Sequence, residues 1–447
     1  METKDITHSP VGSPTSKYGV GPKAEAKVKP VTVAEGLLRK GLKVAKGAGR
    51  LYFYDETVGK YTPGTGGLRH RLTVMLGEDW APSIPNTVIT YLRDIALDLW
   101  ETPPLDRVNV LNGILNIDTL ALEPHSPDFL SPVQLGADWD PEAECPEVQK
   151  FLDQVFPADA VPVAFELIGY LCLPDNSLQV AFLLVGEGAN GKSTFLNMVT
   201  KLLGPDNISN LSLHDLGSNR FAPAELQGKL ANISADIPNR HLADVSLFKA
   251  IVGGDSIMAE RKYGDSFQLT PFSRLLFSAN EIPTSPDVSK GYQRRWKIVP
   301  FPNMFGEADQ DRGLLDKLTT PKEMSGLLNM AIHSYKELRA RGVFKLGDTM
   351  RRAHDEFVEA IDPVAVFIRE KTRVASDASD DKTALYKGYK GWCDEVGHKP
   401  LSARKFNLRI RQHIPGIAEK KVNGRPHWVG ISGVENEAVS MAVFEPG

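Results

Sequence analysis

The sequence has few of the features that mark secreted or membrane-bound proteins. Its 447 residues include only three cysteines, Cys145, Cys172 and Cys393, too few and too scattered for a disulfide framework or a four-thiolate zinc site. No apolar run approaches the roughly 18 residues of a membrane span, and the first twenty residues lack the apolar core of a signal peptide. We therefore expect a reducing, intracellular setting and no secretion.

A net positive charge, the usual sign of a nucleic-acid partner, is also missing. The chain has 52 Lys and Arg against 56 Asp and Glu, for a net charge of −4. The charge is unevenly distributed, since residues 1–50 and residues 401–425 each carry +6, which leaves −16 for the rest. Basic segments at both ends favour a polyanionic partner, although a solvated charged surface explains either segment taken alone equally well.

The composition is that of an ordinary globular protein, with 42% hydrophobic and 24% charged residues, and the length suggests about three domains. The apolar stretches VAFLLVG, KLANISAD and RLLFSAN alternate with helical stretches, which is typical of a parallel sheet buried on both faces. The fold class is therefore predicted to be α/β. We expect a disordered basic tail (1–30), an α+β accessory domain (31–145), the α/β core (146–305), a helical extension (306–370), an ordered unit of two helices and a hairpin (380–432) and a tail (433–447).

Local patterns predict several elements within these segments. Residues 31–46 and 86–100 have helical spacing, and residues 51–63 indicate two short strands around a turn. Two Asn-Gly pairs, at 112–113 and 423–424, are typical of hairpin turns. The polar stretch ASDASDDK at 375–382 indicates a linker.

The clearest signal of function is a phosphate-binding loop. Residues 186–193 fit the pattern G-x-x-x-x-G-K-[ST], directly after an apolar strand and before a helical stretch. Backbone N–H groups of such a loop cradle phosphates, Lys192 would reach the β- and γ-phosphates, and Ser193 would ligate Mg²⁺. A nucleoside triphosphate with Mg²⁺ is therefore the expected ligand, although the loop alone does not decide between a kinase, a GTPase, a motor and a switch, and ATP is what the family resemblance described below implies. The predicted nucleotide-binding residues are Gly186, Glu187, Gly188, Ala189, Asn190, Gly191, Lys192, Ser193 and Thr194.

Two later strands end in polar residues that suit phosphate chemistry. KLANISAD ends in Asp236, a carboxylate for the Mg²⁺ shell or for orienting the attacking water, and RLLFSAN ends in Asn280, an amide for the γ-phosphate or the water. Neither residue is specific by itself, since polar residues at strand ends are commonly ordinary loop starts. Their order after the loop gives them weight.

Four blocks in order resemble the superfamily 3 helicases of the phage and plasmid primase type, which include the poxvirus primase-helicases. They are GEGANGKST, KLANISAD, LFKAIVGGDSIMAERKYGDSFQLTP, and RLLFSANEIP followed by SKGYQRRWKIVPF. The resemblance extends with less force over about 110–432. It implies an AAA+-like ATPase core for 146–305, a C-terminal winged helix for 380–432 and the host cytoplasm as location. Ala235 stands before Asp236 where several members have an acidic pair, which leaves the role of Asp236 open.

The resemblance also implies roles for further residues. One of Arg294 and Arg295, with Arg295 favoured, would be an arginine finger acting on the neighbouring subunit of a ring, six subunits being what the family suggests. A surface arginine pair is the alternative. A hairpin tip at 261–263 would grip DNA in the ring channel, and a solvated turn is the alternative there. The predicted DNA-binding residues are Lys249, Arg261, Lys262, Tyr263, Arg404, Lys405, Arg409, Lys420, Lys421 and Arg425.

These features favour an ATP-driven DNA helicase of viral or mobile-element replication. A replication initiator that uses ATP only to switch its assembly is the second reading, a small-molecule kinase is the third, and winged helices also dock proteins. The segment before residue 145 has no zinc-ligand spacing, and its D-x-D, Asp138 to Asp140, lies in a Pro-rich stretch. We therefore expect no priming by this chain alone and name a separate primase or polymerase as a possible partner.

Overall fold

The computed structural model describes residues 28–433, apart from 236, 238–241, 243, 283, 284, 286, 308, 309 and 399. Contacts separate this chain into a small unit, formed by the residues up to 42 and 65–95, and a larger unit, formed by 43–64 and the residues from 96 onward. Almost all of the two expected tails, 1–30 and 433–447, lies outside the described residues.

The small unit is helical. It consists of α1 (Pro30–Arg39), α2 (Gly66–Leu76), the 3-10 turn η1 (Gly77–Asp79) and α3 (Ser83–Ile95), with α1 packed on α3. The helix predicted over 31–46 is wrong in its second half, because Gly41 at φ +97° ends it and a strand starts at Val44. The helix predicted over 86–100 is α3, which begins at Ser83 and ends at Ile95, earlier than expected at both ends.

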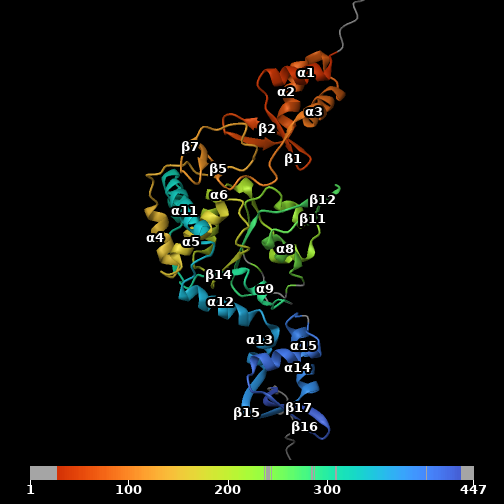
Figure 1. Ribbon diagram of the computed structural model, residues 1–447, viewed down its shortest axis with the longest axis vertical. Helices are drawn as coiled ribbons and strands as arrows, with labels where there is room; N and C mark the ends of the chain where they lie inside the picture. The colour runs from red at the N-terminus through yellow and green to blue at the C-terminus, as the bar shows by residue number, and fades with distance from the viewer. Residues whose placement is uncertain are drawn as a thin grey trace, which may run out of the picture. The chain divides into compact units, whose positions relative to one another are not determined.

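Two small sheets, one mixed and one antiparallel, open the larger unit (Figure 1). One has the order β3-β2-β1-β4, with β1 (Val44–Gly47), β2 (Arg50–Asp55), β3 (Lys60–Pro63) and β4 (Leu97–Asp98), the last parallel to β1. The other comprises β5 (Arg107–Val110), β6 (Gly113–Asn116) and β7 (Leu122–Glu123). The hairpin predicted over 51–63 and the turn at 112–113 are confirmed.

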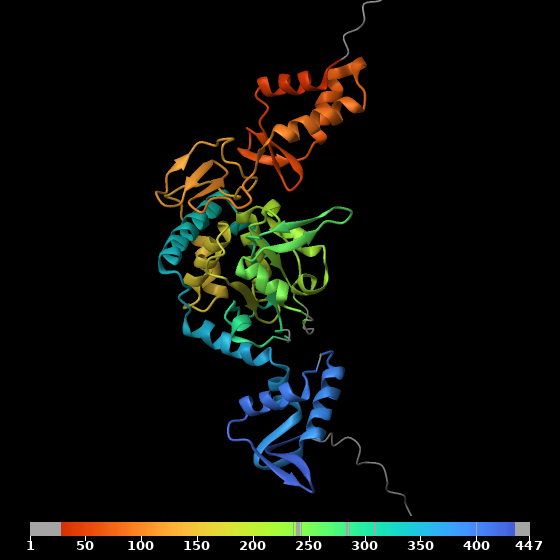
Figure 2. The ribbon, with the colours of Figure 1, turned by 45° about the vertical axis from the view of Figure 1, so that its right-hand side comes forward.

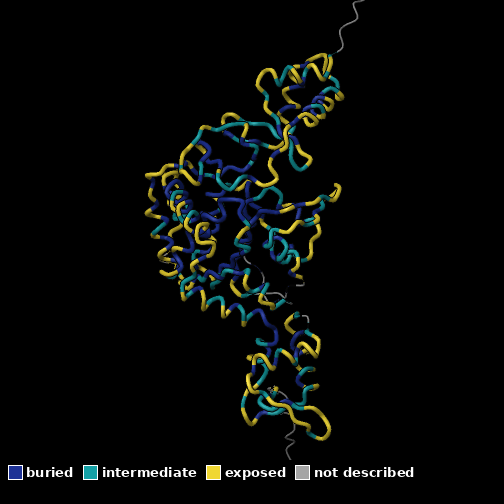
Figure 3. Tube along the Cα trace, viewed as in Figure 1, coloured by how far each residue is buried: buried dark blue, intermediate teal, exposed yellow. Residues whose placement is uncertain are grey.

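A five-stranded parallel sheet forms the centre of the larger unit. Its order is β14-β8-β13-β10-β9, from β14 (Trp296–Pro300), β8 (Ala181–Val185), β13 (Arg274–Ala279), β10 (Ala231–Ser234) and β9 (Ile208–Ser209). Every residue of β10 and β13 is buried, as the continuous apolar strands predict. Figure 3 shows much of the interior of the larger unit in dark blue. The predicted α/β class is confirmed, since helices accompany this parallel sheet as well as the smaller sheets.

Alternate side chains of the sheet serve two separate cores. In β8, Phe182 and Leu184 face one core, whereas Ala181 and Leu183 face the other. The first core is covered by α4 (Pro146–Val155), α5 (Val161–Cys172), α6 (Lys192–Leu203), α10 (Leu314–Leu318) and α11 (Pro321–Arg341). Gly169 allows α5 to approach α11, because a Cβ there would lie 2.1 Å from the carbonyl oxygen of Ala331.

The second core lies under shorter helices. These are α7 (Leu213–Ser218), α8 (Ser246–Gly253), α9 (Lys290–Gln293) and part of α12 (Asp348–Ala360), and Figure 1 shows α8 and α9 on the side away from α4 and α5. The 3-10 turns η2 (Pro205–Asn207) and η3 (Ala222–Leu226) join elements of the core. Between α8 and β13 the chain forms the hairpin β11 (Ile257–Glu260) and β12 (Ser266–Leu269), which Figure 2 shows in green.

The C-terminal part of the larger unit has its own core. Its elements follow the order α13 (Pro363–Lys371), β15 (Thr372–Asp381), α14 (Lys382–Glu395), α15 (Ala403–His413), β16 (Ala418–Val422) and β17 (Arg425–Gly433). The linker predicted over 375–382 is wrong, because residues 375–381 belong to β15, whose last three residues pair with β17 after a register shift, and Lys382 begins α14. The hairpin turn at Asn423-Gly424 is confirmed, with φ of +51° and +77°.

None of the helices in the described part of the chain combines the length and the apolarity that a membrane-spanning helix needs. The three cysteines are free and buried.

Candidate functional site

The glycine-rich segment predicted to bind phosphate lies between β8 and α6. Gly191 caps α6 in the left-handed region at φ +88°, and a Cβ there would lie 2.7 Å from Cγ1 of Val155. A Cβ at Gly186 would lie 2.4 Å from the carbonyl oxygen of Phe301, whereas Gly188 has open space around it. Two of the three glycines are therefore required by close approach, and the loop leads directly into a 12-residue helix whose first N–H groups have no partner within the helix.

Lys192 is held inside this loop. Its side chain is 5% exposed, and its Nζ donates to the carbonyl oxygens of Gly186 and Glu187, the latter at 3.0 Å. It also donates to Oδ1 of Asn190 at 3.3 Å and to Oδ1 of Asn280 at 3.2 Å. A buried ammonium without such partners would be costly, so the loop keeps this cation solvated by its own oxygens.

The contact between Lys192 and Asn280 confirms that the structure brings these two predicted residues together. It arises because β8 and β13 are parallel neighbours with Val185 opposite Ala279. The residues that follow the two strands therefore emerge at the same edge of the sheet. We call this edge, where β8 and β13 end, the carboxyl end of the sheet, and the edge where they begin the amino end.

A cavity of about 710 Å³ opens beside the loop. One wall is α4, and another is the segment after β14, which sequence reasoning did not include in the site. No local pattern indicates these residues, because α4 and this segment reach the loop only through the tertiary fold. The lining residues outside the loop are Glu147, Lys150, Phe151, Gln154, Val155, Asn280, Phe305, Gln310, Asp311, Arg312, Leu314 and Lys317.

The described residues supply one of the two predicted metal ligands. Ser193 is exposed at the start of α6 and lines the cavity. The other predicted ligand, Asp236, lies outside the described residues, two positions after β10 ends at Ser234. No group of three or more His, Cys, Asp or Glu side chains gathers into a metal site in the part of the chain that is described. A serine with few protein ligands fits Mg²⁺, which keeps several waters and takes phosphate oxygens.

The two arginines lie at the amino end of the sheet. They immediately precede β14, and the carbonyl oxygen of Arg295 accepts the N–H of Ala181, the first residue of β8. Nη1 of Arg295 donates to the carbonyl oxygen of Gly291 at 2.6 Å, and Nη2 of Arg294 donates to Oε1 of Gln179 at 3.3 Å. Burial and the neighbouring Arg294 lower the pKa of Arg295, whose Nε is buried without a partner.

The hairpin tip differs from the expectation at one of its three predicted residues. Tyr263 is 95% exposed at φ +64°, and Nζ of Lys262 lies 5.2 Å from its ring centroid. Arg261 instead turns back, with its guanidinium 4.7 Å from the ring centroid of Phe267 and hydrogen-bonded to Oε1 of Gln227. The expectation that Arg261 projects from the tip is therefore wrong.

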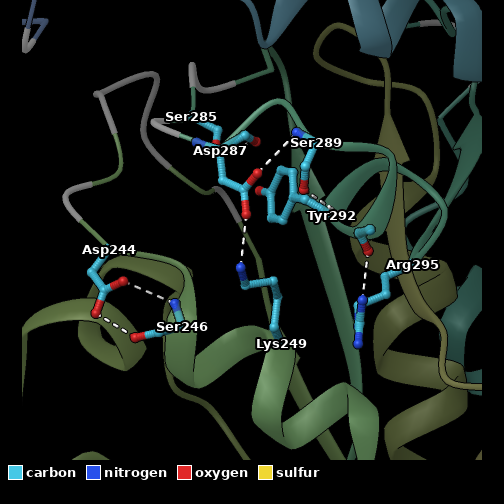
Figure 4. A network of polar contacts seen from close by, with 9 residues as sticks. Asp244, Ser246, Lys249, Ser285, Asp287, Ser289, Tyr292 and Arg295 are labelled. Atoms are coloured by element: carbon cyan, nitrogen blue, oxygen red, sulfur yellow. Dashed lines mark hydrogen bonds and ion pairs between the residues drawn. The ribbon is translucent and has the colours of Figure 1, made fainter. Parts of the chain in front are cut away.

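Lys249, predicted to face DNA or nucleotide, is paired with a carboxylate. Its Nζ lies 2.8 Å from Oδ2 of Asp287, in the segment between β13 and α9 (Figure 4). Asp287 also accepts the N–H of Ser289 at 2.8 Å through Oδ1. Burial by itself raises the pKa of Asp287, but the hydrogen bonds from Lys249 and Ser289 outweigh it and hold the pKa below its usual value.

The basic residues predicted at the C-terminus fall on two elements, α15 and the β16–β17 hairpin. Five of the six are exposed. Arg409 is the exception, since its Nε lies 3.6 Å from the buried Asp362 and its Nη1 donates to Oε1 of Gln412. The exposed residues are Arg404, Lys405, Lys420, Lys421 and Arg425.

Comparisons with known families match three parts of the chain. Residues 184–295 match a family of unknown function (DUF5906), residues 78–157 match a family described as D5 N terminal like, and residues 360–430 match a family described as poxvirus D5 protein-like. The D5 similarity thus begins at residue 78, earlier than the 110 expected from the motifs.

Two viral proteins are similar over longer stretches. Putative helicase 121R of Invertebrate iridescent virus 3 is 25% identical over 347 residues, which cover 68% of this chain and 36% of the viral protein. Putative helicase L207/L206 of Acanthamoeba polyphaga mimivirus is 26% identical over 254 residues, covering 53% and 26% respectively. The chain therefore spans about a third or less of the length of these relatives.

Among solved structures, the A form of the NrS-1 C-terminal region aligns with 90% of this chain and 100% of its own length, at 14% identity and a TM-score of 0.47. That similarity is too weak to argue from. The two D5 families and the helicase-named viral proteins, in contrast, agree with the resemblance carried by the four sequence blocks. The chain is thus similar to the D5 families over 78–157 and 360–430, and to helicase-named viral proteins over longer stretches.

Proposed function

We propose that this protein is an ATP-driven DNA helicase or translocase of viral or mobile-element replication, which hydrolyses ATP at the interfaces between subunits of a ring, six in number by the family resemblance. The observation that carries the proposal is the separation of two predicted catalytic groups across one sheet. Lys192 and Asn280 meet at the carboxyl end, whereas Arg294 and Arg295 lie at the amino end.

The strand register explains why this separation favours a ring. Trp296 pairs with Ala181 and Pro300 pairs with Val185, so the arginines and the loop lie beyond opposite ends of β8 and β14, whose paired part is roughly 13 Å long. Both guanidinium groups are also held by partners at the amino end. An arginine acting on the γ-phosphate therefore has to come from a second copy of the chain.

The chain's own residues have distinct parts in the proposed hydrolysis. The loop N–H groups and Lys192 hold the β- and γ-phosphates, Asn280 orients the attacking water, and the cavity beside α4 takes the base and sugar. Asp236 is proposed to hold the metal or position the water. Mg²⁺, when bound with ATP, neutralises charge on the phosphate oxygens.

DNA is proposed to contact the hairpin tip and the C-terminal unit. Lys262 offers a cation for the backbone, and Tyr263 offers an exposed ring for a sugar or base. The order helix, strand, helix, helix and hairpin in the C-terminal unit supports a winged helix, with α15 as the recognition helix and the β16–β17 hairpin as the wing. A separate primase or polymerase is the proposed partner in replication.

The test is hydrolysis and unwinding by one preparation. Wild-type protein should hydrolyse ATP, should do so faster with DNA, and should separate a forked duplex, and Lys192→Ala should do none of these. Hydrolysis without any unwinding would remove the helicase part of the proposal while leaving the ATPase.

A second function, that of a replication initiator switched by ATP, is favoured by the basic C-terminal unit. Its exposed cations lie on both the helix and the wing, an arrangement that suits duplex DNA. An initiator would bind one duplex sequence tightly and show negligible turnover. Measuring the specific affinity of the full chain for duplex sites alongside its turnover distinguishes the two functions.

A further inference from the structure

Helix α8 connects two elements to which the proposed function gives different tasks. At its C-terminal end, the chain passes through Gly253 and Gly254 directly into β11 of the DNA-facing hairpin. Along its length, α8 packs against the segment that carries the arginine pair. We call residues 287–295, from Asp287 through α9 to Arg295, the arginine turn.

Apolar contacts hold the arginine turn against α8. The ring of Phe248 stacks on Trp296 with centroids 4.6 Å apart and an interplanar angle of 15°, and it meets Tyr292 edge-on at 5.4 Å. Tyr292 and Trp296 flank the arginine pair in the sequence and are each about 1% exposed. Close-packed interiors transmit displacements, so a shift of α8 moves both residues that bracket the arginines.

Polar contacts continue from the next residue of the same helix. Lys249 donates to Asp287 at 2.8 Å, and Asp287 accepts the N–H of Ser289. Oγ of Ser289 in turn caps α9 by accepting the N–H of Tyr292 at 3.3 Å. Figure 4 shows this chain of contacts, which ends where Arg295 donates to the carbonyl oxygen of Gly291 within the same turn.

A second and longer contact runs beside the first. The side-chain amide of Gln179 donates to the carbonyl oxygen of Gly253 at 3.4 Å and accepts from Arg294 at 3.3 Å. It therefore joins the C-terminal end of α8 to the arginine pair. Both distances exceed those of ordinary hydrogen bonds, so we assign the main connection to Lys249 and Asp287.

We propose that Lys249 and Asp287 are positioning residues that couple the DNA-facing hairpin to the arginine turn through α8. This inference rests on the proposed function and assigns Lys249 a role inside the subunit, in place of a direct contact with DNA. A hairpin that is held by DNA fixes α8, and the ion pair fixes the arginine turn relative to α8. The guanidinium that reaches the neighbouring nucleotide is then placed best when DNA is bound.

The experiment uses three variants of the full chain. Lys249→Met removes the ammonium and keeps an unbranched apolar side chain, and Asp287→Asn keeps an acceptor for Ser289 while removing the charge. The third variant carries both changes. We measure kcat and KM for ATP with and without single-stranded DNA, and the affinity for the same DNA.

Each single change should lower the DNA-stimulated kcat about fivefold to tenfold, a size typical of coupling within a network, and leave the KM for ATP unchanged. The double variant should fall no further than either single variant, because all three lose the same interaction. The charge-reversed pair Lys249→Asp with Asp287→Lys should recover part of the loss. A purely structural role would not produce this split between kcat and KM or this recovery.

Asp244→Asn is the matched control. Asp244 precedes the N-terminal end of the same helix, where it accepts the N–H and the hydroxyl of Ser246, and in Figure 4 it lies apart from the arginine turn. It should match the wild type in kcat and in DNA stimulation.

Two outcomes would overturn the inference. Unchanged kcat and stimulation in both single variants would show that the ion pair carries no coupling. A loss of DNA affinity in Lys249→Met that Asp287→Asn does not share would return Lys249 to the DNA surface. The proposed function fails separately, in the wild type, if DNA does not stimulate hydrolysis or if Lys192→Ala keeps it.

Discussion

The two ends of the parallel sheet carry cations that differ in burial and in their hydrogen-bond partners. At the carboxyl end, Lys192 is buried and surrounded by oxygens of its own loop. At the amino end, Arg294 is exposed and donates to Gln179, and Arg295 is half-buried and donates to the carbonyl oxygen of Gly291. The difference teaches that one sheet holds its cations in two unlike environments, and under the proposed function these ends would be the two halves of a site completed by a neighbouring copy.

Removing the cation of the carboxyl end should have the largest effect. Lys192→Ala deletes the ammonium that would meet the phosphates and that now contacts Asn280. We expect ATP hydrolysis to fall at least about 100-fold, measured as phosphate release at saturating ATP. Lys201→Ala, an exposed residue in the last turn of the same helix, is the control and should match the wild type. A Lys192→Ala protein with half of the normal rate would contradict the assignment of this end.

Removing the cation of the amino end should give a defect that a second subunit can repair. Arg295→Ala is expected to lower kcat by about 10³-fold, the lower range for an arginine finger. In an equimolar mixture with Lys192→Ala, about one interface in four keeps both groups, so part of the activity should return. Arg294→Ala in the same mixing test shows which arginine acts. If neither arginine variant gains activity on mixing, the two ends do not meet across an interface.

Helix α8 packs beside the arginines of the amino end and leads into the β11–β12 hairpin. A change at the tip of this hairpin should have a smaller effect than loss of either cation, and it should affect DNA binding alone. Tyr263→Ala removes a ring that is 95% exposed, so folding should be unaffected. We expect about a tenfold loss of affinity for single-stranded DNA, the low end of a stacking contribution. Hydrolysis without DNA should stay at the wild-type level. Met258→Ser, an exposed residue on β11, is the control, and equal losses in both variants would remove the special role of the ring.

The C-terminal unit lies outside both ends of the sheet and supplies the smallest expected effect. Burial raises the pKa of Asp362, but hydrogen bonds from His413 and the N–H of Val364 outweigh it and hold the pKa below its ordinary value. A carboxyl with a lowered folded-state pKa stabilises above its unfolded pKa of about 4, and this contribution is lost as pH falls through the folded pKa.

The C-terminal unit should therefore unfold more easily below about pH 4, while Asp362→Asn should have a flatter pH profile. Urea unfolding followed by tryptophan fluorescence at several pH values measures this, since Trp392 and Trp428 lie in this core. Identical pH profiles for the two proteins would show that Asp362 contributes nothing to the acid sensitivity.

Local patterns in the sequence predicted what depends on a few consecutive residues. The loop at 186–193, its following helix and the turn at 423–424 are of this kind, because glycines and capping positions determine them directly. Lys192 and Asn280 were each predicted to act on the phosphates or the attacking water, and the structure adds their direct contact, which arises because β8 and β13 are parallel neighbours.

Contacts between segments that are distant in the sequence could not be predicted from local sequence patterns. Arg261 turns away from the hairpin tip because Phe267 and Gln227 offer it a ring and an acceptor, and Gln227 lies 34 positions earlier in the chain. Residues 375–381 belong to β15 despite their polar composition, because the strand pairs with β17 on both sides of a register shift, up to Val374 and again over 379–381. The wall of the cavity formed by α4 was missed for the same reason. Asp236 lies outside the described residues, so its role stays a prediction.

The oxygens that surround the ammonium of Lys192 would compete with a phosphate for this cation. They already supply the ammonium with partners, so an arriving phosphate replaces contacts instead of meeting a bare charge. Affinity for nucleotide is then a difference between two sets of bonds and can be modest even though the phosphate contacts are strong. Under the proposed function this exchange would also release the side chain of Asn280 from Lys192. The side chain of Asn280 would then be bonded to Lys192 when the loop is empty and free of it when nucleotide is bound. Binding at the loop after β8 would in this way change a side chain that follows the neighbouring strand, β13.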